Sequence, residues 1–250
     1  MIIKADLHVH SKSSIDGRSE ISEIVKAAAN RGIDAIAITD HDICSVLPQS
    51  NDVLLIPAAE ITTDAGHILA LFLETPIDMK SLFDASSIVN AEKAIQVIHA
   101  HGGIAVWAHP FAPQKANKKQ FQNLEIDAVE TQNARAPLKD VAANQKAREL
   151  AALRSLPCVG GSDAHHASEI GSCYTEFECN AKTIEDLRRA LRCGDCRAVF
   201  VHSCSKTKKA LSQMHKARQN GFVPFCRSLI YFAWSLIQDI FQKQRRNKGI

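Results

Sequence analysis

The stretch Asp6-Leu7-His8-Val9-His10 follows the apolar start Met1-Ile2-Ile3 and decides how the chain is interpreted. An apolar run of this length is typical of a buried strand. Side chains alternate along a strand, so His8 and His10 point to the same face. Two imidazoles on one face can bind one metal ion. The stretch therefore predicts a metal site at the end of the first strand.

Similar short motifs recur downstream, each beside a short apolar run that is typical of a strand. They are Thr39-Asp40-His41-Asp42, Gly66-His67, Ala108-His109-Pro110 and Gly161-Ser162-Asp163-Ala164-His165. Because each of these histidines is expected at a strand end, the motifs predict one metal centre assembled from many strand ends, and such a centre is where chemistry usually takes place.

Strand-like and helical patterns alternate along the first 200 residues, which favours βαβ units and a parallel sheet. The carboxyl ends of parallel strands in a barrel share one face, where active sites form. Ser19 is expected to cap the first helix and Gly32 to end it, and Thr183 with Asp186 to cap the last helix of the body. Strands are expected over 2–7, 33–39, 53–57, 68–73, 104–108, 126–129 and 156–159, and helices over 20–32, 91–101, 138–153 and 183–191.

Composition sets the broad class. The chain has 250 residues, 46% hydrophobic and 23% charged, which suits one soluble globular domain with an appendage. The apolar start is too short for a secretory signal, and no apolar segment is long enough to span a bilayer. We therefore expect a cytoplasmic protein whose eight cysteines are reduced thiols. Cys193 and Cys196 form a CxxC motif near His202 and Cys204, for which a structural zinc or a redox pair remains an alternative.

The pattern changes after Phe200, so we divide the chain into a body, 1–200, and a basic, amphipathic extension, 201–250. Residues 205–250 carry ten Lys or Arg and one Asp, a net charge of +9, which leaves −6 for the rest of a chain of net charge +3. A helix with a broad apolar stripe is expected over 224–246. It could pack on the body or on a second subunit, or lie on a membrane surface. The basic segment 206–218 could instead bind a nucleic-acid backbone.

The candidate metal ligands share one chemistry, since imidazole and carboxylate together suit zinc, manganese or iron. Nine are too many for one ion and suit two or three ions that share a bridging carboxylate. His99, His101, His166, His202 and His215 are expected to be ordinary polar residues. The nine ligands are His8, His10, Asp16, His41, Glu60, His67, His109, Asp163 and His165.

The four motifs, in this order, resemble the PHP (polymerase and histidinol phosphatase) family over about residues 1 to 200. The segments 129–135 and 160–166 are most similar to its small nucleotide phosphatases and 5′→3′ exonucleases. The resemblance implies a distorted (β/α)7 TIM-like barrel, here with a C-terminal helical extension, and a trinuclear site. It implies a first ion on His8, His10, Glu60 and Asp163, a second on Glu60, His67 and His109, and a third on Asp16, His41 and His165.

The predicted function is that of a metal-dependent phosphoesterase acting on a small phosphomonoester, with nucleotides as the preferred class. Divalent ions (Mn²⁺, Zn²⁺ or Fe²⁺) would activate water and neutralise phosphate oxygens. The alternatives are a 5′→3′ exonuclease on short RNA or DNA, a histidinol-phosphate-type phosphatase, and a metal-binding regulatory module. The residues expected to carry catalysis are His8, His10, Glu60, Asp163 and His165, and those expected to contact substrate are Arg135 and Asn133, with Lys12 and Arg18 as weaker candidates.

Overall fold

One twisted sheet organises the protein. The computed structural model describes residues 1–83, 88–112, 124–180 and 182–247, with side chains as far as residue 241. In these ranges the strand order is β7-β6-β5-β4-β3-β2-β1-β8-β9. The strands are β1 (Ile2–Val9), β2 (Ala35–Ile38), β3 (Leu54–Thr63), β4 (Gly66–Leu71), β5 (Ile104–Trp107), β6 (Ala128–Asn133), β7 (Cys158–Gly161), β8 (Cys173–Glu178) and β9 (Cys196–Phe200).

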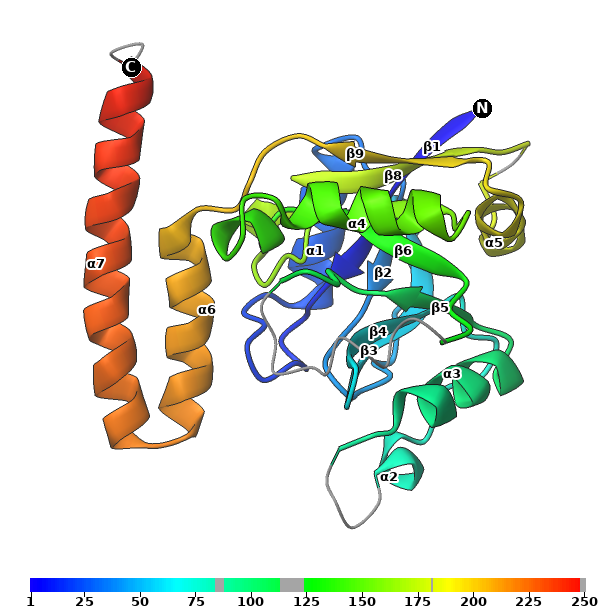
Figure 1. The fold of residues 1–250 in the computed structure, drawn as a ribbon, viewed down its shortest axis with the longest axis horizontal. Coiled ribbons are helices and arrows are strands. Elements are labelled where there is room, and N and C mark those ends of the chain that lie inside the picture. The colour runs from blue at the N-terminus through cyan, green and yellow to red at the C-terminus, as the bar shows by residue number, and fades with distance from the viewer. Residues whose placement is uncertain (84–87, 113–123, 181, 248–250) are drawn as a thin grey trace.

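The sheet curls until β7 comes back beside β1, which gives a nearly closed barrel (Figure 1). The Ser162 N–H donates to Asp6 over 2.8 Å, and the His10 N–H donates to the Ala164 carbonyl over 2.8 Å. These bonds join the ends of β1 and β7 across the closure. The predicted α/β, TIM-like barrel is therefore confirmed, although its strand count differs from a regular barrel of seven units.

The prediction of a fully parallel sheet is wrong at β4. β1, β2 and β3 run parallel, as do β5, β6 and β7, but β4 is antiparallel to both neighbours. The turn between β3 and β4 is too short for a crossover helix, and Thr63 closes it by donating to the Gly66 carbonyl over 2.6 Å. The first residues of β4 therefore lie beside the end of β3, at the same rim as the carboxyl ends of the parallel strands.

β8 and β9 were not predicted, and they extend the sheet beyond β1 as antiparallel strands. β8 alternates buried and less buried residues, which is the pattern of a strand with one covered face. The strand predicted over 126–129 is found as β6 and runs on to Asn133, while the one predicted over 156–159 begins two residues later as β7. Each shift moves a strand end closer to the residues at the rim.

Helices cover the outside of the sheet. α1 is capped differently from the prediction: Glu20 is the N-cap residue, and its N–H donates to the Glu23 carboxylate over 2.9 Å. Ser19 instead accepts a bond from Ala167 N–H. The capping of α5 by Thr183 and Asp186 is confirmed. The helices of the body are α1 (Ile21–Ala29), α2 (Met79–Leu82), α3 (Ala91–Ala100), α4 (Ala143–Leu153) and α5 (Ile184–Cys193), with short 3-10 turns at Ala136–Leu138 and Ala167–Glu169.

The extension forms a helical hairpin of α6 (Lys206–Gln219) and α7 (Phe222–Asn247), with α6 between the barrel and α7 (Figure 1). α7 confirms the helix expected over 224–246. α6 was not predicted, because its sequence is polar and lacks a clear apolar stripe. No helix among the described residues is both long enough and apolar enough to cross a membrane.

Candidate metal centre

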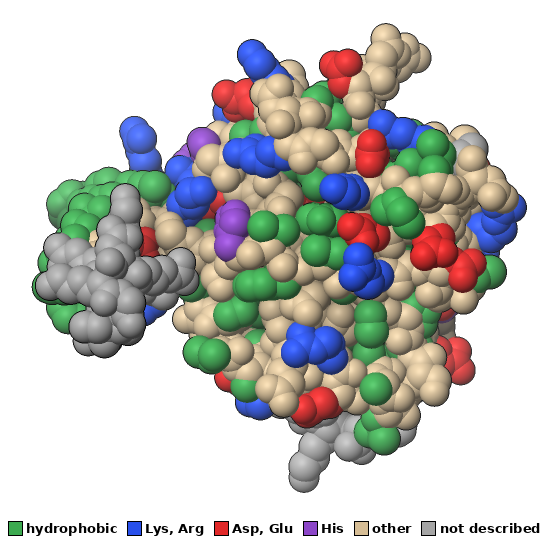
Figure 2. All heavy atoms as spheres, turned by 90° about the horizontal axis from the view of Figure 1, so that it is seen from above, with side chains coloured by type: hydrophobic (Ala, Val, Ile, Leu, Met, Phe, Trp, Pro, Cys, Tyr) green, Lys and Arg blue, Asp and Glu red, His purple; other side chains and the backbone are tan. Residues whose placement is uncertain are grey.

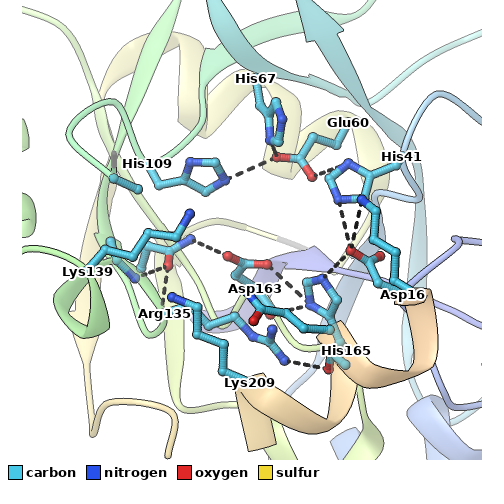
Figure 3. Close-up of a pocket in the computed structure, with 16 residues that line it drawn as sticks. Asp16, His41, Glu60, His67, His109, Arg135, Lys139, Asp163, His165 and Lys209 are labelled. Carbon is cyan, nitrogen blue, oxygen red and sulfur yellow. Dashed lines mark hydrogen bonds and ion pairs between the residues drawn. The ribbon is translucent and has the colours of Figure 1, made fainter. Parts of the chain in front are cut away.

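All nine predicted ligands lie together at the rim of the barrel, although they come from six strands and the loops that follow them (Figure 3 shows most of them). His8 is the second-to-last residue of β1, and His10 and Asp16 follow the strand. His41 comes after β2, His109 after β5, and Asp163 and His165 after β7. Glu60 and His67 differ from the prediction, because Glu60 lies within β3 and His67 within β4. His67 reaches the rim because β4 runs in the opposite direction.

Glu60 is the centre of the cluster, since its fully buried carboxylate is surrounded by five imidazoles. Oε1 lies 2.7 Å from His67 Nδ1 and 3.2 Å from His109 Nε2. Oε2 lies 3.0 Å from His41 Nδ1, 3.3 Å from His10 Nε2 and 3.4 Å from His8 Nε2. The two oxygens therefore face two different groups of histidines, as a bridging carboxylate requires.

Two aspartates serve the other side of the cluster. Asp163 Oδ1 lies 3.5 Å from His10 Nε2 and 3.4 Å from His165 Nδ1. Asp16 Oδ2 lies 3.4 Å from His165 Nε2 and 3.7 Å from His41 Nε2. The loop position of Asp16 thus does not keep it from the cluster.

The buried atoms of this cluster fit a divalent metal. His8 Nε2, His10 Nε2 and Glu60 Oε2 are buried and have no hydrogen-bond partner among the residues that the structure describes, a costly arrangement unless a cation satisfies them. Imidazole nitrogens with carboxylate oxygens are the donor set of zinc, manganese and iron sites. Within the described ranges, four groups have ligand atoms close enough to hold an ion: His8, His10 and Glu60; His8, His109 and Asp163; His41, Glu60 and His67; and His10, Asp16, His41 and His165.

The charge states of Glu60 and His10 suit a cation-binding site. Burial opposes ionisation of Glu60, but His67, His41 and His8 outweigh it and hold the pKa of Glu60 well below its usual range. Burial, followed by His165 and His41, lowers the pKa of His10 to about 3. A neutral imidazole beside a charged carboxylate is the protonation state in which both can bind a metal.

Backbone strain is concentrated at the same rim. His109 and Asp163 have φ angles of 27° and 53°, in a region that residues with a side chain seldom adopt. Such conformations persist only where the surrounding structure enforces them, and they are common at functional sites.

Glu130 is a positioning residue that the sequence interpretation missed. It is buried in β6, and its Oε1 lies 3.0 Å from His8 Nδ1. Its Oε2 accepts bonds from His109 N–H over 2.8 Å and from Asn133 Nδ2 over 3.0 Å. Carboxylates that hold the second nitrogen of a ligand histidine fix its orientation. The available signal was a glutamate in the strand-like run Ala128-Val129-Glu130.

Asp40 is a second residue that the interpretation quoted without a role. Its carboxylate accepts bonds from the Ser11 N–H and the Ser11 hydroxyl, both over 2.6 Å, and from Ser45. It thereby ties the loop after His10 to the end of β2.

Arg135 and Asn133, the expected substrate contacts, both line the pocket over the cluster. The Arg135 guanidinium is buried, and its Nη2 donates to Glu169 over 2.7 Å and to Ser212 over 3.2 Å. Asn133 Oδ1 accepts from the backbone N–H groups of Arg135 and Ala136 and so shapes the turn after β6. The arginine is therefore held rigidly rather than free in solvent.

The remaining singled-out residues do not line the pocket over the cluster, although the Arg18 N–H donates to the His165 carbonyl over 2.9 Å. Lys12 pairs with Glu20 at the surface, and neither Lys12 nor Arg18 is among the residues that line the pocket. His99 lies 2.8 Å from Asp127, and His166 bonds Ser168. The eight cysteines are free thiols, and no group of potential ligands found in the described ranges includes Cys193 or Cys196.

Comparison with known proteins agrees with the geometry of a metal centre on an α/β barrel. The PHP domain model matches residues 6–139, more than half of the chain, and a PHP-associated model matches residues 141–196. The chain therefore belongs to the PHP family, as its four motifs predicted.

An uncharacterized protein of Methanocaldococcus jannaschii is 34% identical over 149 residues, which are 53% of this chain and 82% of the relative. A two-domain protein from Bacteroides vulgatus, containing a predicted PHP-like metal-dependent phosphoesterase, matches with a TM-score of 0.61 and 22% identity, over 80% of this chain and 65% of that one. The lesion-specific endonuclease PfuEndoQ from Pyrococcus furiosus matches with a TM-score of 0.60 and 19% identity, over 79% of this chain and 58% of that one. The chain thus spans less than two thirds of both solved proteins, whose likeness shows the barrel fold.

Proposed function

We propose that the protein hydrolyses phosphomonoesters, with nucleotides as its substrate class, at a trinuclear metal centre. The observation that carries the proposal is the surrounding of Glu60 by five imidazoles, with Asp16, Asp163 and His165 completing the cluster. One bridging carboxylate and eight further donors are more than one ion can use.

In this proposal the ligand sets follow the motifs. One ion is held by His8, His10, Glu60 and Asp163, a second by Glu60, His67 and His109, and a third by Asp16, His41 and His165. When bound, the ions activate water and neutralise the phosphate oxygens. We assign catalytic importance to the ligands His8, His10, Glu60, Asp163 and His165.

The chain's own residues contribute orientation. Glu130 keeps the Nδ1 side of His8 engaged, so that Nε2 faces Glu60 and Asp163. Arg135 lines the same pocket as the ligands and is held by Glu169, so it presents a fixed positive charge to a phosphate. Asn133 fixes the backbone of Arg135, which supports a positioning role for Asn133.

A 5′→3′ exonuclease acting on short RNA or DNA is the second candidate. The basic helix α6 lines the pocket, where a nucleic-acid backbone could follow it. Endonuclease Q, a protein of the same fold, has been solved in complex with a 27-mer duplex substrate. No residue in the pocket selects histidinol phosphate, and the complete ligand set disfavours a purely regulatory module.

The test is a substrate panel with Mn²⁺ that reads phosphate and nucleotide release separately. Phosphate release from nucleoside monophosphates supports the phosphatase, whereas nucleotide release from oligonucleotides supports the exonuclease. His10→Ala should abolish either activity and lower the metal content. His99→Ala, which changes a histidine paired with Asp127, is the matched control and should leave both unchanged. Full activity after exhaustive chelation would refute the metal mechanism.

A partner for α7 is proposed separately. α7 leaves apolar side chains exposed along its length, including Ile230 at 74%, Trp234 at 58% and Phe241 at 61% (Figure 2 shows the apolar surface on that side of the molecule). The extension is strongly basic, so two copies would repel each other, whereas an anionic membrane surface offers both charge and an apolar layer. We therefore favour peripheral membrane contact through residues 224–246 over subunit contact.

Flotation with liposomes of anionic and of neutral lipids tests this contact. Substitution of Trp234 by Ser should release the protein from anionic liposomes. Failure of the wild-type protein to float with anionic lipid, together with a dimer in solution, would favour the subunit contact instead. The variant is preferable to truncation near Phe200, because truncation would also remove α6 from the pocket.

A further inference from the structure

Helix α6 forms one wall of the pocket over the metal cluster. Lys209, Ser212, Gln213 and Lys216 of α6 line that pocket together with the candidate ligands. α6 begins after residue 196, where the family models end. A segment outside both matched regions therefore contributes directly to the surface that a substrate meets.

The position of α6 is fixed by contacts with the barrel. The Cys204 N–H, just before the helix, donates to the Ala134 carbonyl over 2.8 Å. Ser212 accepts a bond from Arg135, and Lys208 Nζ donates to the Ser168 carbonyl over 3.1 Å. The side chains of α6 in the pocket are therefore held at defined places.

Lys209 is the notable side chain of this wall. Only 8% of it is exposed, and it has no acidic partner within ion-pair distance in the part of the chain that the structure describes. Lys139, which follows β6, reaches the same pocket and is equally without an acidic partner there (Figure 3). Arg135 differs, since it already has an acidic partner in Glu169.

An unpaired, largely buried ammonium group is unfavourable, because burial removes water without supplying a counter-charge. The effect is visible in the pKa of Lys209, which burial and then the charge of Lys139 lower to about 8. An anion placed between the two ammonium groups would remove both penalties.

We propose that Lys209 and Lys139 form a phosphate-binding subsite beside the metal cluster, so that α6 is part of the active site. The proposal rests on the proposed phosphoesterase function and names the residues that hold the substrate's charge. The phosphate bound there is either the one being hydrolysed or a second phosphate of the same substrate.

The first experiment compares KM values for two substrates that differ by one phosphate, adenosine 5′-monophosphate and adenosine 3′,5′-bisphosphate. Lys209→Gln should raise KM about tenfold, as expected for the loss of one charge-assisted contact. A rise with both substrates assigns the subsite to the hydrolysed phosphate, and a rise with the bisphosphate alone assigns it to a second phosphate. Unchanged KM values for both substrates would overturn the proposal.

Two variants serve as controls. Lys209→Arg keeps the charge and should retain most of the affinity. Arg218→Gln removes a positive charge from an exposed position of the same helix that does not line the pocket, and its KM values should match those of the wild-type protein. An equal effect of Arg218→Gln would show that general charge, and not the subsite, is responsible.

The second experiment does not depend on turnover. In chelator-treated protein, inorganic pyrophosphate should raise the Tm of the wild type more than that of Lys209→Gln. Without pyrophosphate the variant should be as stable as the wild type or more so, whereas a residue that merely anchors α6 would lower Tm. If the wild type hydrolyses no phosphoester but pyrophosphate stabilisation still requires Lys209, the proposed function fails and the subsite stands. Equal stabilisation of both proteins would refute the subsite.

Discussion

The rim of the barrel and the C-terminal hairpin differ in the kinds of charged side chain that they carry. At the rim, acids and histidines are buried and face one another, with Glu60 fully buried among five imidazoles. In the hairpin, most charges are basic and Asp239 is the single acid of residues 205–250. The rim thus favours the binding of cations, whereas the side of the hairpin that faces the rim favours the binding of anions. A phosphate bound between metal ions and lysines would satisfy both.

The largest expected effect comes from removing the centre of the rim. Glu60→Gln takes away the charge that five imidazoles face, so bound metal should fall sharply and turnover should drop to the background. Metal content by elemental analysis and phosphate release should be measured on the same preparation. Glu92→Gln, an exposed acid in α3, is the matched control. Normal metal content in Glu60→Gln would show that Glu60 is not a shared ligand.

Much of the rim could be predicted from the sequence, because strand geometry places most of its residues. His8 and His10 share a face through the two-residue period of β1, and His41, His109 and Asp163 follow strands whose carboxyl ends meet at one rim. His67 reaches the rim for a reason that the prediction did not contain, since only the reversed direction of β4 brings the start of that strand there.

The docking of the hairpin could not be predicted, because its position depends on contacts between residues far apart in the sequence. Ser212 meets Arg135, and Cys204 meets Ala134, through tertiary packing that leaves no local pattern. β8 and β9 escaped prediction for a related reason: short strands with mixed polarity are recognised by their partners more than by their composition. Glu130 could be seen in the sequence. Its role in orienting His8 could not be predicted, because that role depends on the fold that brings β6 beside His8.

The second prediction concerns Arg135, which pairs with Glu169 of the body and donates to Ser212 of the hairpin. Arg135→Ala should destabilise the protein by about 3–5 kcal/mol, because it leaves Glu169 buried without its partner. Urea denaturation measures the change. Arg197→Ala breaks an ion pair at the exposed surface and should have little effect. If the two variants are equally stable, the buried pair of Arg135 and Glu169 does not contribute to the stability of the protein.

Glu130→Gln should have a smaller effect, on activity rather than on folding. The amide keeps the shape of the side chain but weakens the hold on His8 Nδ1, so activity or metal affinity should fall about 10- to 100-fold. Metal titration together with kcat separates the two outcomes. Glu130→Ala should be worse, since it also removes the acceptor for His109 N–H. Unchanged metal affinity and kcat in both variants would mean that Glu130 is not needed to orient the ligand histidines.

The smallest expected effect tests how α7 holds α6. Asp239 accepts bonds from Lys206 N–H over 3.2 Å and from Thr207 N–H over 2.8 Å, at the start of α6. Loss of a helix-capping side chain costs about 0.5–2 kcal/mol, and the partial exposure of Asp239 places Asp239→Ala at the low end. Burial opposes ionisation, but the bonds from Thr207 and Lys206 outweigh it and lower the pKa of Asp239. Its contribution is therefore complete above the ordinary pKa of 3.8 and is lost as pH falls through the lowered value.

Hydrogen exchange of the first amides of α6 at pH 7 measures this contribution, with Asp52→Ala, an exposed acid far from α6 in sequence, as the control. Faster exchange confined to the start of α6, with a rise in KM smaller than that of Lys209→Gln, would show that α7 serves the active site by keeping α6 in place. Unchanged exchange would show that α7 does not hold α6 in place. The exposed apolar face of α7 would then be its remaining candidate for a function.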